Sequence, residues 1–322
     1  MKLSELKDLI TKMEPVIHEI ENPTLRNIRQ VERYTIVEND EPGEGIEIKR
    51  IVFIDGKRRS FLSAMFGPFT GIFSEIAVGG VMWEKEREVY PLFSPENPPK
   101  VLKILGFPED FRNFYGRDMD RVFVKNYVFE IFMRGKDCHD SVDSVLREYE
   151  KGAVIEALNE YNRALVVKDG TLPDIEDMYF KPGRGPVGLV KNIMATGFSH
   201  ATFKNYYGMR KSERSRMFIW RVHGNLKALK VGTYLKLVDS KGLKGLVRME
   251  ALVKEEDLEV LKEDIGKTFD SLRKILPTLT ADLPIPRLPE NILPIQFLED
   301  SLSKYMTDRD YMITCIYESL HG

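Results

Sequence analysis

The sequence has few cysteines and no long apolar run, which limits the environments in which the protein can work. The two cysteines, Cys138 and Cys315, fit no disulfide framework and indicate an intracellular protein. No stretch reaches the ~20 consecutive apolar residues of a membrane-spanning helix, and the start of the chain does not resemble a signal peptide. We therefore predict a soluble, cytoplasmic protein with no membrane partner.

Glutamine and net charge are also scarce. Glutamine occurs twice, as Gln30 and Gln296, whereas 30% of the 322 residues are charged. Few thermolabile amides with abundant Lys and Glu are typical of a thermophile. A net charge of −2 means that any nucleic-acid-binding surface must be local. Apolar residues make up 43% of the chain, enough for a sizeable core in one large domain or two smaller ones.

Two familiar ligand-binding patterns are missing. Cys138 and His139 are adjacent rather than spaced as zinc ligands. The glycines at positions 185 and 188 precede Lys191, but their spacing is not that of a P-loop. A zinc site and a P-loop nucleotide site are therefore disfavoured.

Two apolar runs each lead into an Asp-Gly pair. Residues 51–54 are followed by Asp55 and Gly56, and residues 164–167 are followed by Lys168 and then by Asp169 and Gly170. Short runs rich in β-branched residues predict strands that are buried on both faces. Carboxylates at the ends of two such strands can converge at one sheet edge and hold a divalent metal ion. The alternative is that each Asp-Gly pair only forms a turn.

A helix is predicted at residues 140–161, and it carries glutamates on or beside its apolar stripe. Glu150 lies within the stripe, one turn from both Leu146 and Val154, and Glu156 flanks it. A charge inside an apolar stripe needs a partner, and a metal ion, a lysine or an arginine would serve. The alternative is that these glutamates lie at the rim of the stripe, in solvent.

Residues 179–216 contain eight lysines and arginines but one acidic residue, Glu213, with aromatic residues between them. Positive charge can follow phosphates and rings can stack on bases, so this composition is typical of single-stranded nucleic-acid binding. The residues that we predict to contact nucleic acid are Lys204, Tyr206, Tyr207, Arg210, Lys211 and Arg214. The alternative is a solvated basic face that also carries tyrosines.

The order of predicted elements indicates an α/β fold. The first 30 residues form an apolar seam that predicts an N-terminal helix, packed on its own domain or on a second subunit. A hairpin is expected at residues 60–83 with its connection near Gly67, a surface insertion at about 87–118, and a strand at 122–133. Strand, hairpin, hairpin is the usual opening of a ribonuclease H-like sheet. Further strands are expected at 217–223, 233–238 and 245–252, and helices at 258–276 and 289–305.

We therefore predict one domain over residues 1–322. Its catalytic core spans residues 46–254, and C-terminal helices occupy residues 255–322. The expected architecture is a ribonuclease H-like mixed sheet flanked by helices, with an N-terminal helix and inserted surface segments.

The ordered set of motifs resembles the NurA nuclease family of archaea and some bacteria. These motifs are Ile54-Asp55-Gly56, the helix around Glu150, Val167-Lys168-Asp169-Gly170-Thr171-Leu172, Gly188-Leu189-Val190-Lys191, Val247-Arg248-Met249-Glu250 and the helix led by Pro289. The resemblance implies a ribonuclease H-like core, manganese-dependent digestion of DNA ends and a toroidal homodimer. It also implies partnership with a hexameric HerA-like translocase.

The resemblance also implies roles for particular residues. Asp55 and Asp169 match metal ligands, Glu150 best suits the helix glutamate with Glu156 as runner-up, and Lys191 stands at the position of a basic residue. Two positions depart from the family pattern. Lys57 stands where the family usually has a small residue, and Gln296 stands where the last helix usually has a histidine. Glu299 or Asp300, one turn further on, would be the replacement for that histidine.

The sequence thus predicts a Mn²⁺- or Mg²⁺-dependent deoxyribonuclease that acts in DNA-end repair. Asp55, Glu150 and Asp169 would hold the metal, and Lys191 would contact a phosphate as a point charge. An alternative is a non-catalytic DNA-binding adaptor of the same fold, which the departures at Lys57 and Gln296 favour. A nucleotide-dependent enzyme of the same broad fold is disfavoured by the lack of a glycine-rich phosphate loop.

Overall fold

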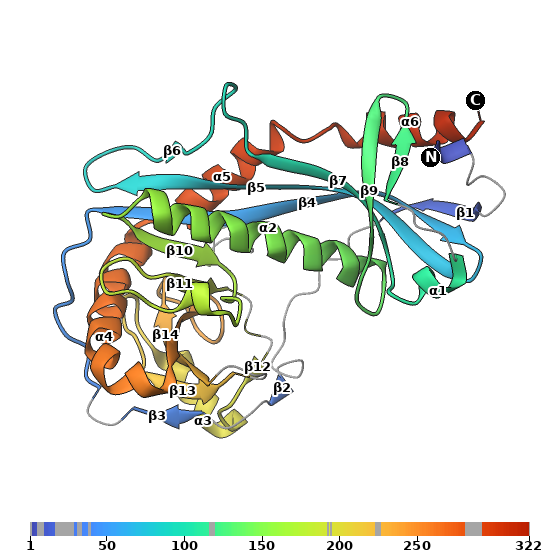
Figure 1. Ribbon diagram of the computed structural model, residues 1–322. Coiled ribbons are helices and arrows are strands. Elements are labelled where there is room, and N and C mark those ends of the chain that lie inside the picture. The colour runs from blue at the N-terminus through green and yellow to red at the C-terminus, as the bar shows by residue number, and fades with distance from the viewer. Residues whose placement is uncertain are drawn as a thin grey trace.

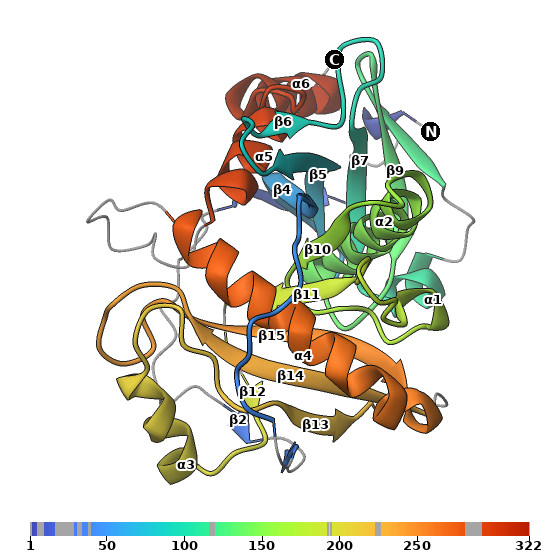
Figure 2. The same ribbon diagram turned by 90° about the vertical axis from the view of Figure 1, so that its left-hand side faces the viewer.

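The computed structural model describes residues 2–4, 10–16, 29–30, 34–37, 40–115, 120–191, 193, 195–222, 227–280 and 292–321. This part of the chain has a mixed α/β fold, in which helices flank one large mixed sheet (Figures 1 and 2). The strands are β1 (Ile10–Pro15), β2 (Arg29–Gln30), β3 (Thr35–Ile36), β4 (Arg50–Phe66), β5 (Phe69–Glu84), β6 (Tyr90–Pro91), β7 (Lys100–Phe107), β8 (Arg121–Val124), β9 (Tyr127–Met133), β10 (Leu165–Asp169), β11 (Val187–Val190), β12 (Ala195–Thr196), β13 (Phe218–Arg221), β14 (Ala228–Lys236) and β15 (Leu246–Lys254). The α-helices are α1 (Phe111–Tyr115), α2 (Cys138–Glu160), α3 (His200–Lys204), α4 (Leu258–Ile275), α5 (Leu293–Ser303) and α6 (Arg309–His321).

The centre of the sheet has the strand order β7-β5-β4-β10-β11. Strand β5 pairs antiparallel with both β4 and β7, whereas β10 runs parallel to β4 and β11 runs parallel to β10. Beyond β11, the antiparallel strands β15, β14 and β13 continue the sheet, and β9 and β8 extend its opposite end. The predicted hairpin is confirmed, because β4 and β5 are joined at Gly67-Pro68.

Helices cover both faces of the central strand β4. Ile51 and Phe53 pack into the same apolar cluster as residues of α4 and α5, whereas Val52 and Ile54 pack with residues of α2. Figure 2 shows α2 on one side of β4 and α4 and α5 on the other. Since successive side chains of a strand point to opposite faces, a run of four apolar residues is buried throughout. The predicted strand with two buried faces is confirmed here, with exposed fractions of 0–3% over residues 51–54.

Strand β4 does not end at Asp55 and Gly56, as the sequence analysis expected. It continues for 17 residues to Phe66, where Phe61 and Phe66 join a second apolar cluster with residues of β7, β9 and α6. Gly56 is therefore not part of a turn. A Cβ atom at this position would lie 2.6 Å from Leu146 Cδ1, so the glycine allows α2 to pack closely against the strand.

Two further expectations about the chain are wrong in the described residues. Residues 87–118 are not only a surface insertion, because β7 pairs with β5 inside the sheet and Phe107 and Phe111 are fully buried. Residues 10–15 are not helical, because they form β1 along the edge of β4. Tertiary pairing with this edge overrides the local apolar spacing. The rest of the predicted N-terminal helix lies mostly outside the described residues. In the part of the chain described, no helix has the length and apolar content needed to cross a membrane.

A buried ion-pair network fastens the segment before β4 to α4. Arg214 Nη1 lies 2.7 Å from Asp40 Oδ2, and Arg214 Nε lies 2.7 Å from Asp270 Oδ1 on α4. The Gly43 N–H also donates to Asp270 Oδ2 at 2.9 Å. The Arg214 side chain is only 1% exposed, so this residue cannot bind a phosphate at the surface. Its predicted role in nucleic-acid binding is therefore wrong.

We expect Arg214→Leu to lower the free energy of unfolding by about 3–5 kcal/mol, because it removes the arginine that two buried carboxylates share and leaves Asp270 with only the partly exposed Arg273. Arg216→Leu is the matched control. Arg216 pairs with Glu41, and both side chains are more than half exposed, so its loss should cost about 1 kcal/mol or less. Urea unfolding followed by circular dichroism measures both values, and equal losses in the two variants would contradict the proposed importance of the buried network.

Candidate metal site

The pairing of β10 with β4 brings two distant aspartates together. The two strands run parallel, and the register pairs Lys168 with Ile54 as its last residues. Asp169 and Asp55 follow at the next position of each strand, so their side chains point to the same face of the sheet. Gly170 then turns the chain away with φ of +86°, a conformation that favours glycine. The prediction that two carboxylates from the two runs converge here agrees with this geometry.

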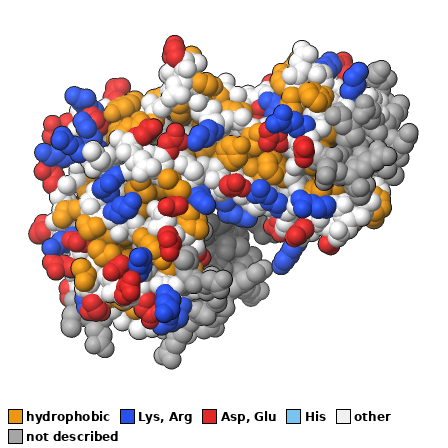
Figure 3. Space-filling view, in the orientation of Figure 1, with side chains coloured by type: hydrophobic (Ala, Val, Ile, Leu, Met, Phe, Trp, Pro, Cys, Tyr) orange, Lys and Arg blue, Asp and Glu red, His pale blue; other side chains and the backbone are white. Residues whose placement is uncertain are grey.

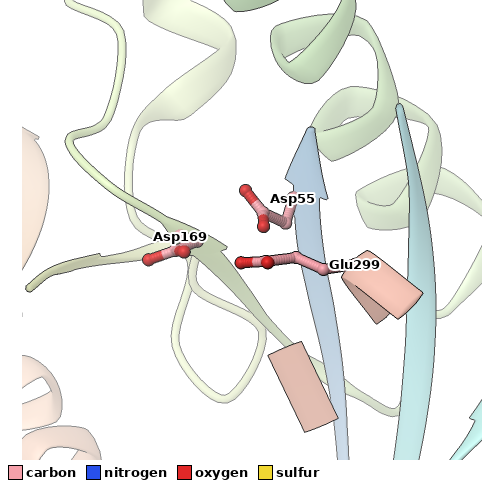
Figure 4. Close-up of side chains that lie close together, drawn as sticks. All are labelled: Asp55, Asp169 and Glu299. Carbon is pink, nitrogen blue, oxygen red and sulfur yellow. The ribbon is translucent and has the colours of Figure 1, made fainter. Parts of the chain in front are cut away.

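A third carboxylate comes from α5. Glu299 lies on this helix, which packs against β4 and β5 on the face to which Asp55 points. One carboxylate oxygen from each of Asp55, Asp169 and Glu299 can be chosen so that all three lie within 4.8 Å of one another. Figure 4 shows the three side chains pointing toward a common centre from β4, the end of β10 and α5. We call these three residues the acidic trio.

Lys191 is the cation of this cluster. It follows β11, the strand beside β10, and its Nζ lies 2.6 Å from Asp169 Oδ2. Burial works to lower the pKa of Lys191, but Asp169 and Asp55 outweigh this effect and raise the pKa above its usual value. The lysine is therefore held protonated within the trio, as its predicted place beside the metal ligands requires.

Asp55 is a carboxyl group that is costly to ionise in its buried position. It is only 7% exposed, and burial raises its pKa well above the usual value. The negative charge of Asp169 raises this pKa further, Lys191 opposes the rise, and Glu150 and Glu299 add to it. The single positive charge of Lys191 thus does not compensate the acids around Asp55.

The residues present fit a divalent metal ion. Three carboxylates converge, one of them is buried with an unfavourable charge, and the ligand atoms are all oxygens. Oxygen ligands suit Mg²⁺ or Mn²⁺ better than zinc, which prefers nitrogen and sulfur. The arrangement could therefore hold such an ion, with Lys191 close to any group that binds beside it.

Glu150 is not part of this cluster, contrary to the sequence prediction. Its Oε1 lies 2.9 Å from the position that a Cβ of Gly56 would occupy. Gly56 and Asp55 point to opposite faces of β4, so Glu150 lies across the strand from the acidic trio. Its partner is Lys168, whose Nζ lies 2.7 Å from Glu150 Oε2. The sequence had allowed a lysine as the partner of this buried charge, and the structure shows that lysine.

Glu156 and Gln296, two other positions that the sequence analysis considered, also lie outside the acidic trio. Glu156 lies half exposed on α2 and pairs with Lys100 at 2.6 Å, outside the trio. Gln296 lies on α5 one turn before Glu299 and is partly buried. Glu299 was only an alternative in the sequence analysis, because no local pattern links a surface-like Leu-Glu-Asp segment to strands more than a hundred residues away.

Most of the basic segment at residues 179–216 lies far from the acids. Figures 1 and 2 both place α3 at the end of the lower lobe opposite to α5. Lys204, Arg210 and Lys211 are exposed there. Tyr206 and Tyr207 are partly buried and pack on other rings, with centroid distances of 5.0 Å from Tyr206 to Tyr234 and 5.9 Å from Tyr207 to Phe203.

Two residues that the sequence analysis gave no role hold the turn after Asp169. Glu250 Oε1 accepts the Leu172 N–H at 2.9 Å, and Lys230 Nζ donates to Leu172 O at 2.8 Å. Burial works to raise the pKa of Glu250, but Arg248 and Lys230 outweigh it and lower that pKa. In the sequence, a glutamate and a lysine inside largely apolar strands could have indicated this buried pair, because charged side chains are buried only with partners.

We expect Asp55→Asn to stabilise the metal-free protein. A carboxyl whose folded-state pKa is raised destabilises the fold when ionised, and stability falls as pH rises from its unfolded pKa through its raised folded pKa. At pH 7 in EDTA the variant should therefore melt above the unmodified chain, because the neutral amide removes the cost of the buried charge.

Mn²⁺ should reverse the order of the two melting temperatures. An ion that binds only the folded state raises the melting temperature, and we expect this rise for the unmodified chain but not for Asp55→Asn. Thermal unfolding by circular dichroism in EDTA and in Mn²⁺ gives all four values. A lower melting temperature for the variant in EDTA, with no response of the unmodified chain to Mn²⁺, would contradict a metal site at the trio.

Comparisons with known proteins give a likeness to solved structures. No family model matches the sequence, and no curated protein matches it. Among solved structures, the fold is similar to the NurA nuclease from Sulfolobus solfataricus, with a TM-score of 0.46 and 13% sequence identity, over 89% of this chain and 87% of that chain. This structural neighbour carries the name of the family that the ordered motifs of the sequence resemble.

Proposed function

We propose that the protein is a metal-dependent nuclease that hydrolyses phosphodiester bonds of DNA. The observation that carries this proposal is the acidic trio of Asp55, Asp169 and Glu299, which meets around one centre with Lys191 beside it. Converging carboxylates with an adjacent ammonium group provide a site for a cation and for a phosphate at the same place.

Each residue of the site has a distinct role in this proposal. Asp55, Asp169 and Glu299 hold one or two Mn²⁺ or Mg²⁺ ions. When bound, such an ion neutralises the charge that develops on the phosphate and lowers the pKa of the attacking water. Lys191 leaves Asp169 and binds a phosphate oxygen of the substrate. An ion held by the trio would offset the unfavourable charge of the buried Asp55 carboxylate.

The architecture supports a ribonuclease H-like core as part of the proposal. Three antiparallel strands, β7, β5 and β4, are followed by the parallel strands β10 and β11. Helix α2 precedes β10 and covers one face of the sheet. The acids lie at the point where the parallel pairing of β4 and β10 ends, which is where open α/β sheets place their ligands.

The proposal also includes predictions from the sequence that concern more than the site. They comprise one domain over residues 1–322, action on DNA ends in repair, a homodimer and a hexameric HerA-like translocase as partner. The cytoplasmic location and the thermophilic origin also stay predictions.

We expect Asp55→Asn and Glu299→Gln each to lower cleavage of a labelled DNA substrate at least about 100-fold in Mn²⁺, because loss of a ligand forfeits several kcal/mol of charge stabilisation. Glu156→Gln is the matched control. This glutamate lies half exposed, outside the trio, and pairs with Lys100, so cleavage should stay within about threefold of the unmodified chain.

The binding of DNA in EDTA serves as the second readout. It should be retained in all three variants, since the trio repels phosphates when no metal is present. Cleavage by the Asp55→Asn variant, or loss of cleavage in Glu156→Gln alone, would refute the assignment. Binding without any metal-dependent cleavage in the unmodified chain would instead establish the adaptor alternative.

A further inference from the structure

Within the described part of the chain, one edge of β4 has no strand partner beside the acidic trio. The pairing of β4 with β10 ends at Ile54, and its pairing with β1 begins at Leu62. Along the intervening residues 55–61, no described strand pairs with this edge, whereas β5 pairs with the opposite edge up to Ser60 and again from Leu62, with a shift in register at Phe61. At about 3.3 Å per residue, the open stretch is roughly 23 Å long. It starts at Asp55 itself.

Two side chains along this stretch, Lys57 and Arg59, form no ion pair with a described residue. Arg59 lies opposite Glu75 in the ladder with β5, but Glu75 pairs with Lys103. Lys57 and Arg59 alternate with Gly56 and Arg58, so they point to the same face of β4 as Asp55. Arg58, on the other face, pairs with Asp143 at 2.7 Å. Lys57 and Arg59 pair with no carboxylate of the described residues.

Carbonyl oxygens hold these two side chains in place without neutralising them. Lys57 Nζ donates to Glu299 O at 3.4 Å, and Arg59 Nη1 donates to Thr307 O at 2.6 Å. Both side chains are partly buried, which orders them while their charge remains available. A carbonyl leaves an ammonium or guanidinium group able to bind an anion, whereas a paired carboxylate competes with that anion.

Lysine and arginine side chains also gather on the surface below α2. Figure 3 shows them along the lower margin of the described surface in this region. In the same orientation, β4 and α2 cross above this margin, with β11 on one side and α1 on the other (Figure 1). Positive charge is therefore present beside the part of the molecule through which β4 runs.

We propose that this open stretch of β4 is the track of the substrate strand, with Lys57 and Arg59 binding successive phosphates of a single-stranded polynucleotide next to the acidic trio. The inference rests on the proposed nuclease function. Alternate residues of a strand lie ~6.6 Å apart, which is close to the separation of phosphates in an extended single strand. The phosphate at the trio is then the one cleaved, and those beyond it lie on Lys57 and Arg59.

This proposal gives a role to two of the three consecutive basic residues, Lys57-Arg58-Arg59, that follow Gly56. The sequence analysis treated Lys57 only as a departure from the family pattern. In the structure, Lys57 lies two residues beyond Asp55 on the same face of β4, and its side chain donates to the backbone of the helix that carries Glu299. A cation at this place guides a phosphodiester toward the acids, which by themselves repel it.

The salt dependence of binding tests the proposal without catalysis. A fluorescent oligothymidylate is titrated with the protein in EDTA over a range of salt concentrations. Each lost contact between a cation and a single-strand phosphate lowers the slope of log K against log salt by about 0.7. We expect the double variant Lys57→Met/Arg59→Met to lose about 1.4 from this slope, since two contacts are removed.

Three further double variants make the result specific. Lys57→Arg/Arg59→Lys keeps both charges and should restore the slope, which separates charge from misfolding. Lys262→Met/Lys267→Met changes the net charge equally on exposed residues of α4 that pair within their own helix, and it should leave the slope unchanged. Arg210→Met/Lys211→Met tests the rival surface predicted from the sequence.

The outcomes separate this inference from the proposed function. An unmodified chain that binds and cleaves the oligonucleotide, with the same slope in Lys57→Met/Arg59→Met, overturns the track and leaves the nuclease standing. A lowered slope in that variant supports the track, even if Mn²⁺ elicits no cleavage and the nuclease proposal fails. Absence of oligonucleotide binding by the unmodified chain at low salt overturns the track.

Discussion

The parallel pairing of β10 with β4 is the constraint on which the site depends. Four residue pairs, from Leu165 with Ile51 to Lys168 with Ile54, fix the relative position of two segments more than a hundred residues apart. A shift of one residue would turn one aspartate to the opposite face of the sheet. The apolar residues on both faces prevent this shift, so burial of the core and placement of the acids have one cause.

The electrostatics of the site follow from that placement. Because the core strands are covered by helices on both faces, Asp55 ends up in a poorly solvated position beside another carboxylate. Lys191 offsets part of this charge, and on the other face Lys168 offsets Glu150. Asp169 and Glu150 thus each pair with a lysine, whereas Asp55 and Glu299 form no ion pair within the described residues, and the excess negative charge is concentrated on the face of the acidic trio.

The sequence predicted the parts of the site that local patterns encode. Two apolar runs that lead into Asp-Gly indicated Asp55 and Asp169, whereas the role of Lys191 was implied by the resemblance to the NurA family. Glu299 was no more than an alternative, because its place depends on how α5 packs across β4 and β5. Glu150 was misplaced for a related reason. Helical periodicity shows that a residue faces the sheet, but not on which face of the sheet the helix lies.

The fold shows the same division between local and tertiary information. The hairpin at Gly67-Pro68 and the buried strand at residues 51–54 follow from turn chemistry and apolar runs. The strand β7, hidden in a stretch rich in proline and aromatic residues, and the strand β1, hidden in an apparent helical spacing, depend on free sheet edges. Arg214 was misread because composition does not reveal that two distant aspartates enclose it.

The uninterrupted course of β4 has a mechanical consequence. This strand of 17 residues belongs to the apolar cluster around the site at one end and to the cluster beneath α6 at the other. Bending it would break its ladder with β5 along both clusters, so it offers no hinge between the lobes. We therefore expect the two ends of β4 to move together as one rigid body. A long polymer would then reach the site along the edge of β4 that lacks a strand partner in the described residues, without an opening motion between the two ends.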